Sequence, residues 1–212
     1  EALFYQAQAY ELLGDASKAL PIFQRLHYQF PLYANATAVA QSLSALGGTD
    51  LEVPKEWRTG RIEKLFAGRR HSDVLKDLQL LFAIDPAAAN QPQYQLWQGL
   101  SQFGAAQYYA AIQTLKPLRN APLETAARAL FTVAECYRKL DNYSQFKQTT
   151  EEMEAGFAKS RWWEEALFSL ANYNLVRRDL AESLAFYQKI VDRFPNGERV
   201  KDSHWRLSWY TY

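Results

Sequence analysis

Carboxylates are the residues of this sequence that could act as general acids or bases, and they form two clusters. A glycoside-cleaving enzyme needs two such groups, or one whose pKa is raised by its surroundings. Glu151, Glu152 and Glu154 form one cluster, and Glu164 and Glu165 form the other. Glutamate runs on amphipathic helices usually face solvent, and a glutamate in the first turn of a helix complements the helix dipole. We therefore interpret both clusters as structural.

The histidines and the cysteine offer no alternative chemistry. His27, His71 and His204 are far apart in the sequence, and none has a partner at metal-ligand spacing. Cys136 is the only cysteine, so we interpret it as a small helix residue rather than as half of a disulfide or a nucleophile. The sequence contains no glycine-rich phosphate loop. It thus predicts no catalytic residue, no metal and no cofactor.

Aromatic residues are the group with a candidate binding function, because they make up 15% of the chain. Sugars bind on flat aromatic faces, and Trp and Tyr combine an apolar body with a hydrogen-bonding tip. Neighbouring helical residues point about 100° apart, so Trp162 and Trp163 should not both face one core, and we predict that this pair is exposed. Arg161 beside them is a candidate contact for the carboxylates of a glycan or of a partner. Core packing is the alternative for each ring.

The last residues predict a second aromatic surface. Trp205, Ser208, Trp209 and Tyr212 are spaced i, i+3, i+4, i+7, which places them on one face of a helix. We add Trp205 and Trp209 to the candidate glycan or partner contacts. The chain also opens inside a helical pattern without an initiator Met. We therefore expect a piece of a longer protein, whose missing C-terminal part covers this face.

The bulk composition narrows the class of protein. Apolar residues make up 48% and charged residues 22%, which is the globular range. The net charge is +1 and the pI is near 8.0, and no basic stripe is visible, so no nucleic-acid partner is predicted. No apolar run approaches the roughly 18 residues that a membrane span needs.

The segments that carry these residues recur with a period of about 37 residues. The stretch EALFYQAQAYELLGDASKALPIFQRLHYQFP opens the chain, and EALFSLANYNLVRRDLAESLAFYQKIVDRFP, which begins at Glu165, matches it at ten of 31 positions. ALFTVAECYRKL at 129–140 lies one step of 37 before the second copy, and SHWRLSWYTY lies one step after it. Periods of this length are typical of helical solenoids.

Each repeat is predicted to be two helices joined by a short turn. Gly14 suits the position after the first helix, and Asp15 suits the N-cap of the second. In a weaker repeat we expect Gly104 to take the place of Gly14. Ala7 and Ala19 allow the two helices to approach closely. A single pair cannot bury its apolar faces, so the pairs must stack.

The predicted fold is therefore all-α, an antiparallel helix-pair solenoid that forms a tetratricopeptide-like superhelix with about 12 helices. The run GGTDLEVPK is the one clear break. We predict an N-terminal helical repeat piece at 1–47, a loop or hinge at 48–56, and a tetratricopeptide-like solenoid at 57–212 that is truncated at its C-terminus. The expected helices are 2–13, 16–30, 33–46, 58–67, 72–84, 91–103, 105–118, 122–139, 142–157, 161–177, 180–194 and 198–212.

Three stretches resemble the N-terminal superhelical region of soluble lytic murein transglycosylases: AYELLGDASKALPIFQRLHYQFP, RWWEEALFSLANYNLVRRDLAESLAFYQKIVDRFPNG and SHWRLSWYTY. The resemblance covers most of the chain and is strongest from about 122 to 212. It implies a bacterial periplasmic protein whose separate, lysozyme-like catalytic domain cleaves the β-1,4 bonds of peptidoglycan without metal or organic cofactor.

The resemblance places no catalytic residue on this chain. In the family the catalytic glutamate lies in a Glu-Ser motif, with Gln two residues before the glutamate. The only Glu-Ser pair here is Glu182-Ser183, and Leu180 stands two residues before Glu182. Asp179 and Glu182 instead fit the N-cap and N3 positions of a helix. We expect this segment to cleave no glycan.

Two functions follow from these observations. The first is a non-catalytic scaffold and substrate-guiding region of a periplasmic lytic transglycosylase, with a peptidoglycan glycan strand as its partner. The second is a tetratricopeptide-type protein-protein interaction module of a cell-envelope complex. Exposed aromatic rings on a polar concave face favour the first, and a groove shaped for an extended peptide or helix favours the second.

Overall fold

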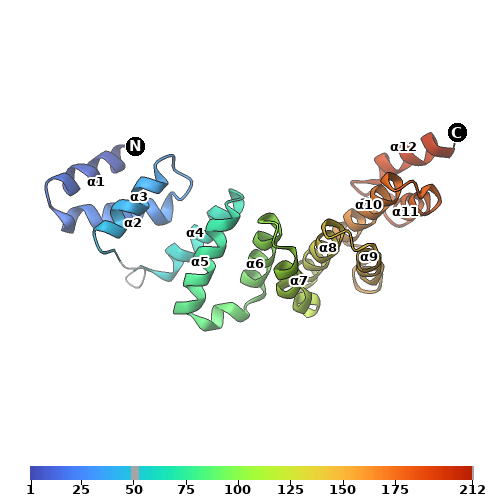
Figure 1. The fold of residues 1–212 in the computed structure, drawn as a ribbon, viewed down its shortest axis with the longest axis horizontal. Helices are drawn as coiled ribbons and strands as arrows, with labels where there is room; N and C mark the ends of the chain where they lie inside the picture. The colour runs from blue at the N-terminus through green and yellow to red at the C-terminus, as the bar shows by residue number, and fades with distance from the viewer. Residues whose placement is uncertain (49–52, 212) are drawn as a thin grey trace. The chain divides into compact units, whose positions relative to one another are not determined.

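The computed structural model describes residues 1–48 and 53–211 of the chain (Figure 1). These residues form twelve α-helices and short 3-10 helices, and the part described contains no strand. The predicted all-α, helix-pair architecture with about 12 helices is confirmed. The close agreement follows from the strong amphipathic periodicity of the repeats.

The chain divides into two compact units, residues 1–90 and residues 91–212, called unit 1 and unit 2 below. The predicted loop or hinge at 48–56 includes residues 49–52, which lie outside the described residues. Within unit 1, α2 packs against α4, the first helix after this loop. The predicted limits 1–47 and 57–212 stay a prediction.

Unit 1 contains two sets of packed helices. The pair α1 and α2 packs with α3, and α4 packs with α5, which a 3-10 helix follows. Ala7 and Ala19 are fully buried, as expected for positions where two helices approach closely. The bounds are α1 Ala2–Leu12, α2 Ala16–Gln29, α3 Ala36–Ala45, α4 Lys55–Ala67, α5 His71–Ile84 and η2 Pro86–Asn90.

Unit 2 is a succession of helix pairs, α6 with α7, α8 with α9, and α10 with α11, followed by α12 (Figure 1). We call the first helix of each pair helix A and the second helix B, so α12 is a further helix A. The bounds are α6 Pro92–Gly104, α7 Tyr108–Leu115, η3 Lys116–Asn120, α8 Leu123–Lys139, α9 Tyr143–Phe157, α10 Arg161–Val176, α11 Leu180–Arg193 and α12 Val200–Thr211.

Consecutive A helices of unit 2 lie closer together than consecutive B helices. α6 packs directly on α8, and α8 packs directly on α10. In the described part of the unit, no comparably extensive contact joins α7 to α9 or α9 to α11. Since the more closely spaced layer lies on the inside of a curved stack, the A helices form the concave side of unit 2.

The turn between helices A and B has the same backbone form in five places. The second residue after the first helix has a positive φ in each case, at Gly14, Arg69, Ala106, Asp141 and Arg178. The next amide N–H then donates to a carbonyl five residues earlier, as in Asp15 to Tyr10 at 2.9 Å and Gln107 to Gln102 at 2.8 Å. This is the Schellman motif, which satisfies the last carbonyls of the helix.

The turn prediction was right for Gly14 and wrong for Gly104. Gly14 has φ +73°, and the Asp15 side chain accepts a hydrogen bond from the Lys18 N–H at the start of α2. Gly104 is still helical, and Ala106 carries the positive φ instead. Tertiary packing fixes where helix A ends, so a residue other than glycine is held in the left-handed region there.

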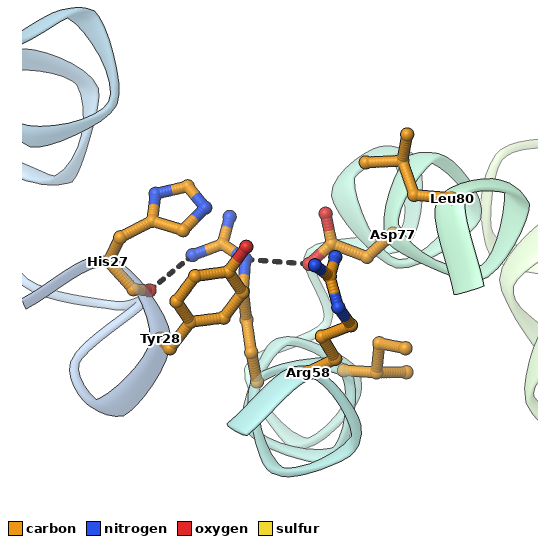
Figure 2. Close-up of a pocket in the computed structure, with 7 residues that line it drawn as sticks. His27, Tyr28, Arg58, Asp77 and Leu80 are labelled. Carbon is orange, nitrogen blue, oxygen red and sulfur yellow. Dashed lines mark hydrogen bonds and ion pairs between the residues drawn. The ribbon is translucent and has the colours of Figure 1, made fainter. Parts of the chain in front are cut away.

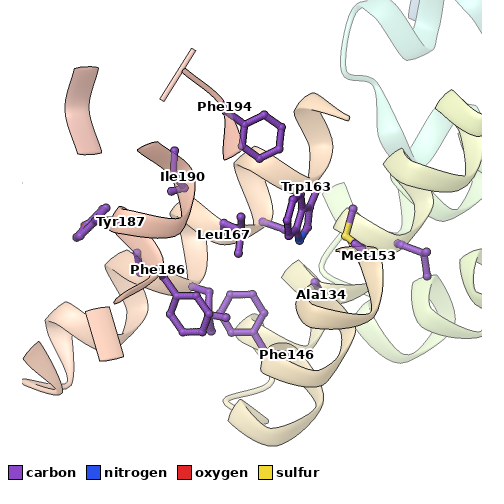
Figure 3. Close-up of a cluster of buried hydrophobic side chains, with 13 residues drawn as sticks. Ala134, Phe146, Met153, Trp163, Leu167, Phe186, Tyr187, Ile190 and Phe194 are labelled. Carbon is purple, nitrogen blue, oxygen red and sulfur yellow. The ribbon is translucent and has the colours of Figure 1, made fainter. Parts of the chain in front are cut away.

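The main core of unit 2 lies between one helix pair and the next (Figure 3). Trp163 of α10 is fully buried in it, and its indole N–H donates to the Thr150 carbonyl of α9 at 3.0 Å. Its ring lies 5.4 Å from that of Phe194, which follows α11. One side chain therefore joins three consecutive helices.

A buried carboxylate fixes the start of α12. Glu164 of α10 is 2% exposed, and it accepts hydrogen bonds from the backbone N–H groups of Glu198 at 3.2 Å and Arg199 at 2.8 Å. The neighbouring Glu165 forms two further bonds with the Arg199 guanidinium, at 2.9 and 3.0 Å. This closely packed connection depends on Gly197, where an added Cβ would lie 2.0 Å from Glu164 Oε1.

We expect Gly197→Ala to lower the free energy of unfolding of unit 2 by about 1–3 kcal/mol, because the Glu164 carboxylate must move away from its N–H donors. Chemical denaturation followed by circular dichroism measures the change. Gly156→Ala in α9 is the matched control, since a Cβ there meets nothing within 4 Å. The control should lose no stability. Equal stability of the two variants would contradict the role given to Gly197.

Candidate functional site

The concave side of unit 2 carries half-buried aromatic rings on its A helices. Trp162 of α10 lies across Phe131 of α8, with the ring centroids 5.4 Å apart. The Trp162 indole N–H donates to Glu124 of α8 at 2.6 Å. Phe168, six residues further along α10, is also half-buried, and its ring lies 5.9 Å from that of Tyr187 on α11. These rings are anchored at one edge and accessible at the other.

Arginine side chains lie against several of these rings. The guanidinium carbon of Arg161 is 4.4 Å from the centre of the Trp162 ring, and that of Arg128 is 5.3 Å from it. Arg199 lies 5.0 Å from the centre of the Phe168 ring. Burial and the nearby positive charge of Arg161 lower the pKa of Arg128. The face therefore combines flat apolar surface with positive charge.

The structure separates Trp162 from Trp163, and the contact role predicted for Trp162 and Arg161 stays a prediction. Trp163 is fully buried, so the prediction that it is exposed and contacts a ligand is wrong. Trp162 is partly exposed, and Arg161 beside it is exposed. The two indoles point in different directions from α10, one into the core and the other onto α8, as neighbouring helical positions must.

The C-terminal aromatic pair is exposed. Trp205 and Trp209 of α12 are 55% and 66% exposed, and their rings stack with centroids 5.7 Å apart. The guanidinium carbon of Arg206 lies 5.1 Å from the centre of the Trp205 ring. Tyr212, predicted on the same face, lies outside the described residues. Trp205 and Trp209 as ligand contacts stay a prediction.

Phe131 and Phe168 were missed as candidate contacts because the periodicity assigned them to the core. Both are only half-buried. The signal that could have found them is their separation, since 168 − 131 is 37, the length of one repeat. Residues at the same position of consecutive repeats line the same surface.

The acidic clusters have partners within the fold. Glu154 pairs with Lys189 at 2.5 Å and Arg193 at 3.0 Å. Glu164 accepts backbone N–H bonds at the start of α12, and Glu165 pairs with Arg199 there. These carboxylates thus connect one helix pair to the next.

Glu182 is also structural. Its backbone N–H donates to the Asp179 side chain at 3.2 Å, so Asp179 is the N-cap that the sequence predicted. Its carboxylate accepts hydrogen bonds from Lys147 and from the Tyr143 hydroxyl, both on α9. These donors lower the pKa of Glu182, which is the wrong direction for a catalytic acid. Burial and the Glu182 contact raise the pKa of Tyr143 to about 12.

The buried thiol is not a nucleophile under ordinary conditions. Cys136 is fully buried in α8, and burial raises its pKa to about 12. A thiol reacts as its thiolate, so its reactivity at neutral pH is suppressed. Among the described residues, no group of three or more His, Cys, Asp or Glu could hold a metal ion. No helix described here is long and apolar enough to cross a membrane.

A polar cavity in unit 1 is too small for an organic ligand (Figure 2). It measures about 30 Å³, close to the space of one water molecule. Arg61 crosses it, donating to the His27 carbonyl at 2.5 Å and to Asp77 at 2.6 Å. Because these contacts join α2, α4 and α5, the cavity is a structural junction.

Comparison with known proteins agrees with the repeat architecture. A family model described as Tetratricopeptide repeat matches residues 1–33 and 165–197, the two copies aligned from the sequence. These two segments are tetratricopeptide-like repeats. A solved structure of a tetratricopeptide repeat protein from Parabacteroides merdae is similar, with 13% identity and a TM-score of 0.48 over 98% of this chain and 73% of that one. No curated protein matches the chain.

We expect Glu182→Gln to lower the free energy of unfolding by about 1–2 kcal/mol at pH 7, because two donors lose a charged acceptor. A lowered carboxyl pKa stabilises the fold above the ordinary pKa of glutamate, and this contribution is lost as the pH falls through the lowered value. The difference between the two proteins should therefore shrink at acid pH. Denaturant titrations between pH 3 and pH 7 measure it.

The control for this comparison is Glu151→Gln. Its carboxylate is 4.0 Å from Lys147 and about half exposed, so the change should stay below about 0.5 kcal/mol. A Glu182→Gln deficit that is the same at every pH would show that the charge of Glu182 is not what stabilises the fold.

Proposed function

We propose that this chain is a non-catalytic scaffold and substrate-guiding region of a periplasmic lytic transglycosylase, and that the concave side of unit 2 contacts the peptidoglycan glycan strand. The observation that carries the proposal is the set of half-exposed rings Phe131, Trp162 and Phe168 with arginines held against them. Pyranose rings have flat C–H faces that pack on aromatic rings. The carboxyl groups that peptidoglycan carries suit the arginines.

The resemblance of residues 122–212 to the transglycosylase superhelix adds the class of enzyme and its compartment. The chemistry is assigned to a part of the protein other than this chain, because no described residue here has the environment of a catalytic acid. Periplasmic location and peptidoglycan binding belong to the proposal and share its test.

A second candidate function is a protein-protein interaction module of a cell-envelope complex. The tetratricopeptide repeat match favours it, because stacked helix pairs of this kind present extended concave surfaces suited to partners. An extended peptide on the same rings would use aromatic contacts and few backbone hydrogen bonds.

The deciding experiment is co-sedimentation of the pure 212-residue chain with purified peptidoglycan. We expect weak binding, and we expect Trp162→Ala to weaken it about two- to tenfold, because it removes the ring, its contact with Phe131 and the support of Arg161. Tyr109→Ala on α7 is the control, since Tyr109 is 73% exposed but lies on a B helix.

Absence of binding at high protein concentration, or equal binding by both variants, would contradict a glycan-guiding role for this face. We also expect no anhydro-sugar product when the chain is incubated with peptidoglycan. Capture of a defined envelope protein that Trp162→Ala abolishes, without peptidoglycan binding, would favour the second function.

A further inference from the structure

One ring position recurs in the last three A helices of unit 2. Phe131, Phe168 and Trp205 lie on α8, α10 and α12, and each is 37 residues after the one before. We call these three residues the aromatic row. Phe131 and Phe168 are half-buried and Trp205 is 55% exposed, so none of the three is a fully buried core residue.

The position is distinct from the one that packs in the core. The residues immediately before Phe131 and Phe168 are Leu130 and Leu167, which are 5% and 0% exposed. In α12 the residue at this core position is His204, which is exposed. Phe168 touches Tyr187 of α11, with the ring centroids 5.9 Å apart, yet it stays only half-buried, as does Phe131. Trp205 therefore stands at a position that a helix B covers only in part.

This register indicates which residues of α12 a following helix B would cover. By the repeat, these are His204 and Ser208, because Ser208 corresponds to Ala134 and Ala171, both fully buried. The prediction that a missing C-terminal part covers Trp205 and Trp209 stays a prediction.

From α8 to α10 the row steps across the helices at the spacing of packed A helices, which is about 8–10 Å. α12 packs mainly on α11, and the sequence register places Trp205 one repeat further on. Equivalent side chains on consecutive helices repeat at about the same distance. The row therefore presents similar flat surfaces at regular intervals, which suits a linear polymer with a repeating unit of that length better than a single small molecule.

The charge beside the row is positive. Arg161 lies against Trp162, whose ring contacts Phe131, and Arg206 lies against Trp205. Neither arginine forms an ion pair with a carboxylate in the residues that the structure describes. Arg199 beside Phe168 is already paired with Glu165. Charge complementarity therefore favours an anionic polymer, which would meet Arg161 on α10 and Arg206 on α12.

We propose that a peptidoglycan glycan strand runs across the A helices of unit 2, with one disaccharide on each ring of the aromatic row. This inference rests on the proposed glycan-guiding function and adds the direction and register of the strand. A β-1,4-linked disaccharide has about the length of one helix step. Every second sugar carries a lactyl group whose carboxyl or attached peptide is anionic, so charge and apolar surface recur together.

A proline-rich peptide is the competing occupant. A polyproline II helix rises about 3.1 Å per residue and has three residues per turn, so it also repeats about every 9 Å and docks on aromatic grooves. It carries no regular negative charge. The arginines therefore favour the glycan, and the peptide becomes an outcome of the test.

The test is a length series. Titration of the 212-residue chain with purified glycan oligomers of one, two, three and four disaccharides, followed by tryptophan fluorescence and calorimetry, gives the affinity for each length. We expect the affinity to rise with each added disaccharide up to at least three, as rings along the row are engaged in turn. Chitin oligomers of equal length, which lack carboxyl groups, should bind more weakly at low salt and approach the same affinity at high salt.

Variants of the row locate the strand. Phe131→Leu and Phe168→Leu keep an apolar side chain of similar volume and remove the flat ring, so folding should be preserved. Each should lower the affinity for the three-disaccharide oligomer about two- to tenfold and flatten the dependence on length. Tyr109→Leu on helix B is the matched control and should leave both unchanged. Thermal melts confirm that each variant is folded.

Three results would overturn the inference. Glycan binding that does not increase beyond one disaccharide, or that ignores Phe131→Leu and Phe168→Leu in folded protein, would refute the register while leaving the proposed glycan-guiding function standing. Failure to bind any oligomer or intact peptidoglycan would refute both. Tight binding of a polyproline peptide that depends on the row, without glycan binding, would assign the row to a protein partner.

Discussion

The contact between one helix pair and the next is the interaction on which this structure depends. A single pair cannot bury its own apolar faces, so stability comes from stacking. Trp163 shows this directly, because its indole belongs to α10, its N–H is bonded to the Thr150 carbonyl of α9, and its ring packs on Phe194 after α11. A core shared between repeats fixes their relative position, and with it the surface that the A helices present together.

The same stacking creates the candidate site. Because A helices pack on one another directly, side chains at one position of consecutive repeats come into line on the concave side. Phe131 and Phe168 reach this side from positions next to buried leucines, and Trp162 is fixed across Phe131 by its bond to Glu124. No loop or cleft is needed, since the repeat itself forms the surface.

The carboxylates illustrate how a charge can be prominent in the sequence and yet serve the fold. Glu164 caps the connection into α12 through backbone N–H groups, and Glu182 joins α9 to α11 through Lys147 and Tyr143. Each bridges residues more than 30 positions apart. In a solenoid such bridges hold successive repeats in register. Clusters of acid in a repeat sequence are therefore weak support for catalysis.

The sequence by itself determined the helices, their period and some of their caps. These properties are local: amphipathic spacing defines a helix, and Asp15 and Asp179 bond the N–H groups three residues ahead of them. The prediction of the turn residue failed in one repeat, because spacing along the chain does not determine where a helix ends. Gly104 looked like the turn residue, but Ala106 has the positive φ, because the packing of helix A decides where it ends.

Only the tertiary structure decided which aromatic side chains are buried and which are accessible. Trp162 and Trp163 are alike in type and adjacent in sequence, but their burial differs. Trp163 points toward the next helix pair and is buried, whereas Trp162 points toward the concave side and stays partly exposed. The same holds for Leu167 and Phe168. A pattern of 3.6 residues per turn identifies an apolar stripe, but the neighbours that cover part of it come from other repeats, and their contacts exist only once the repeats have stacked.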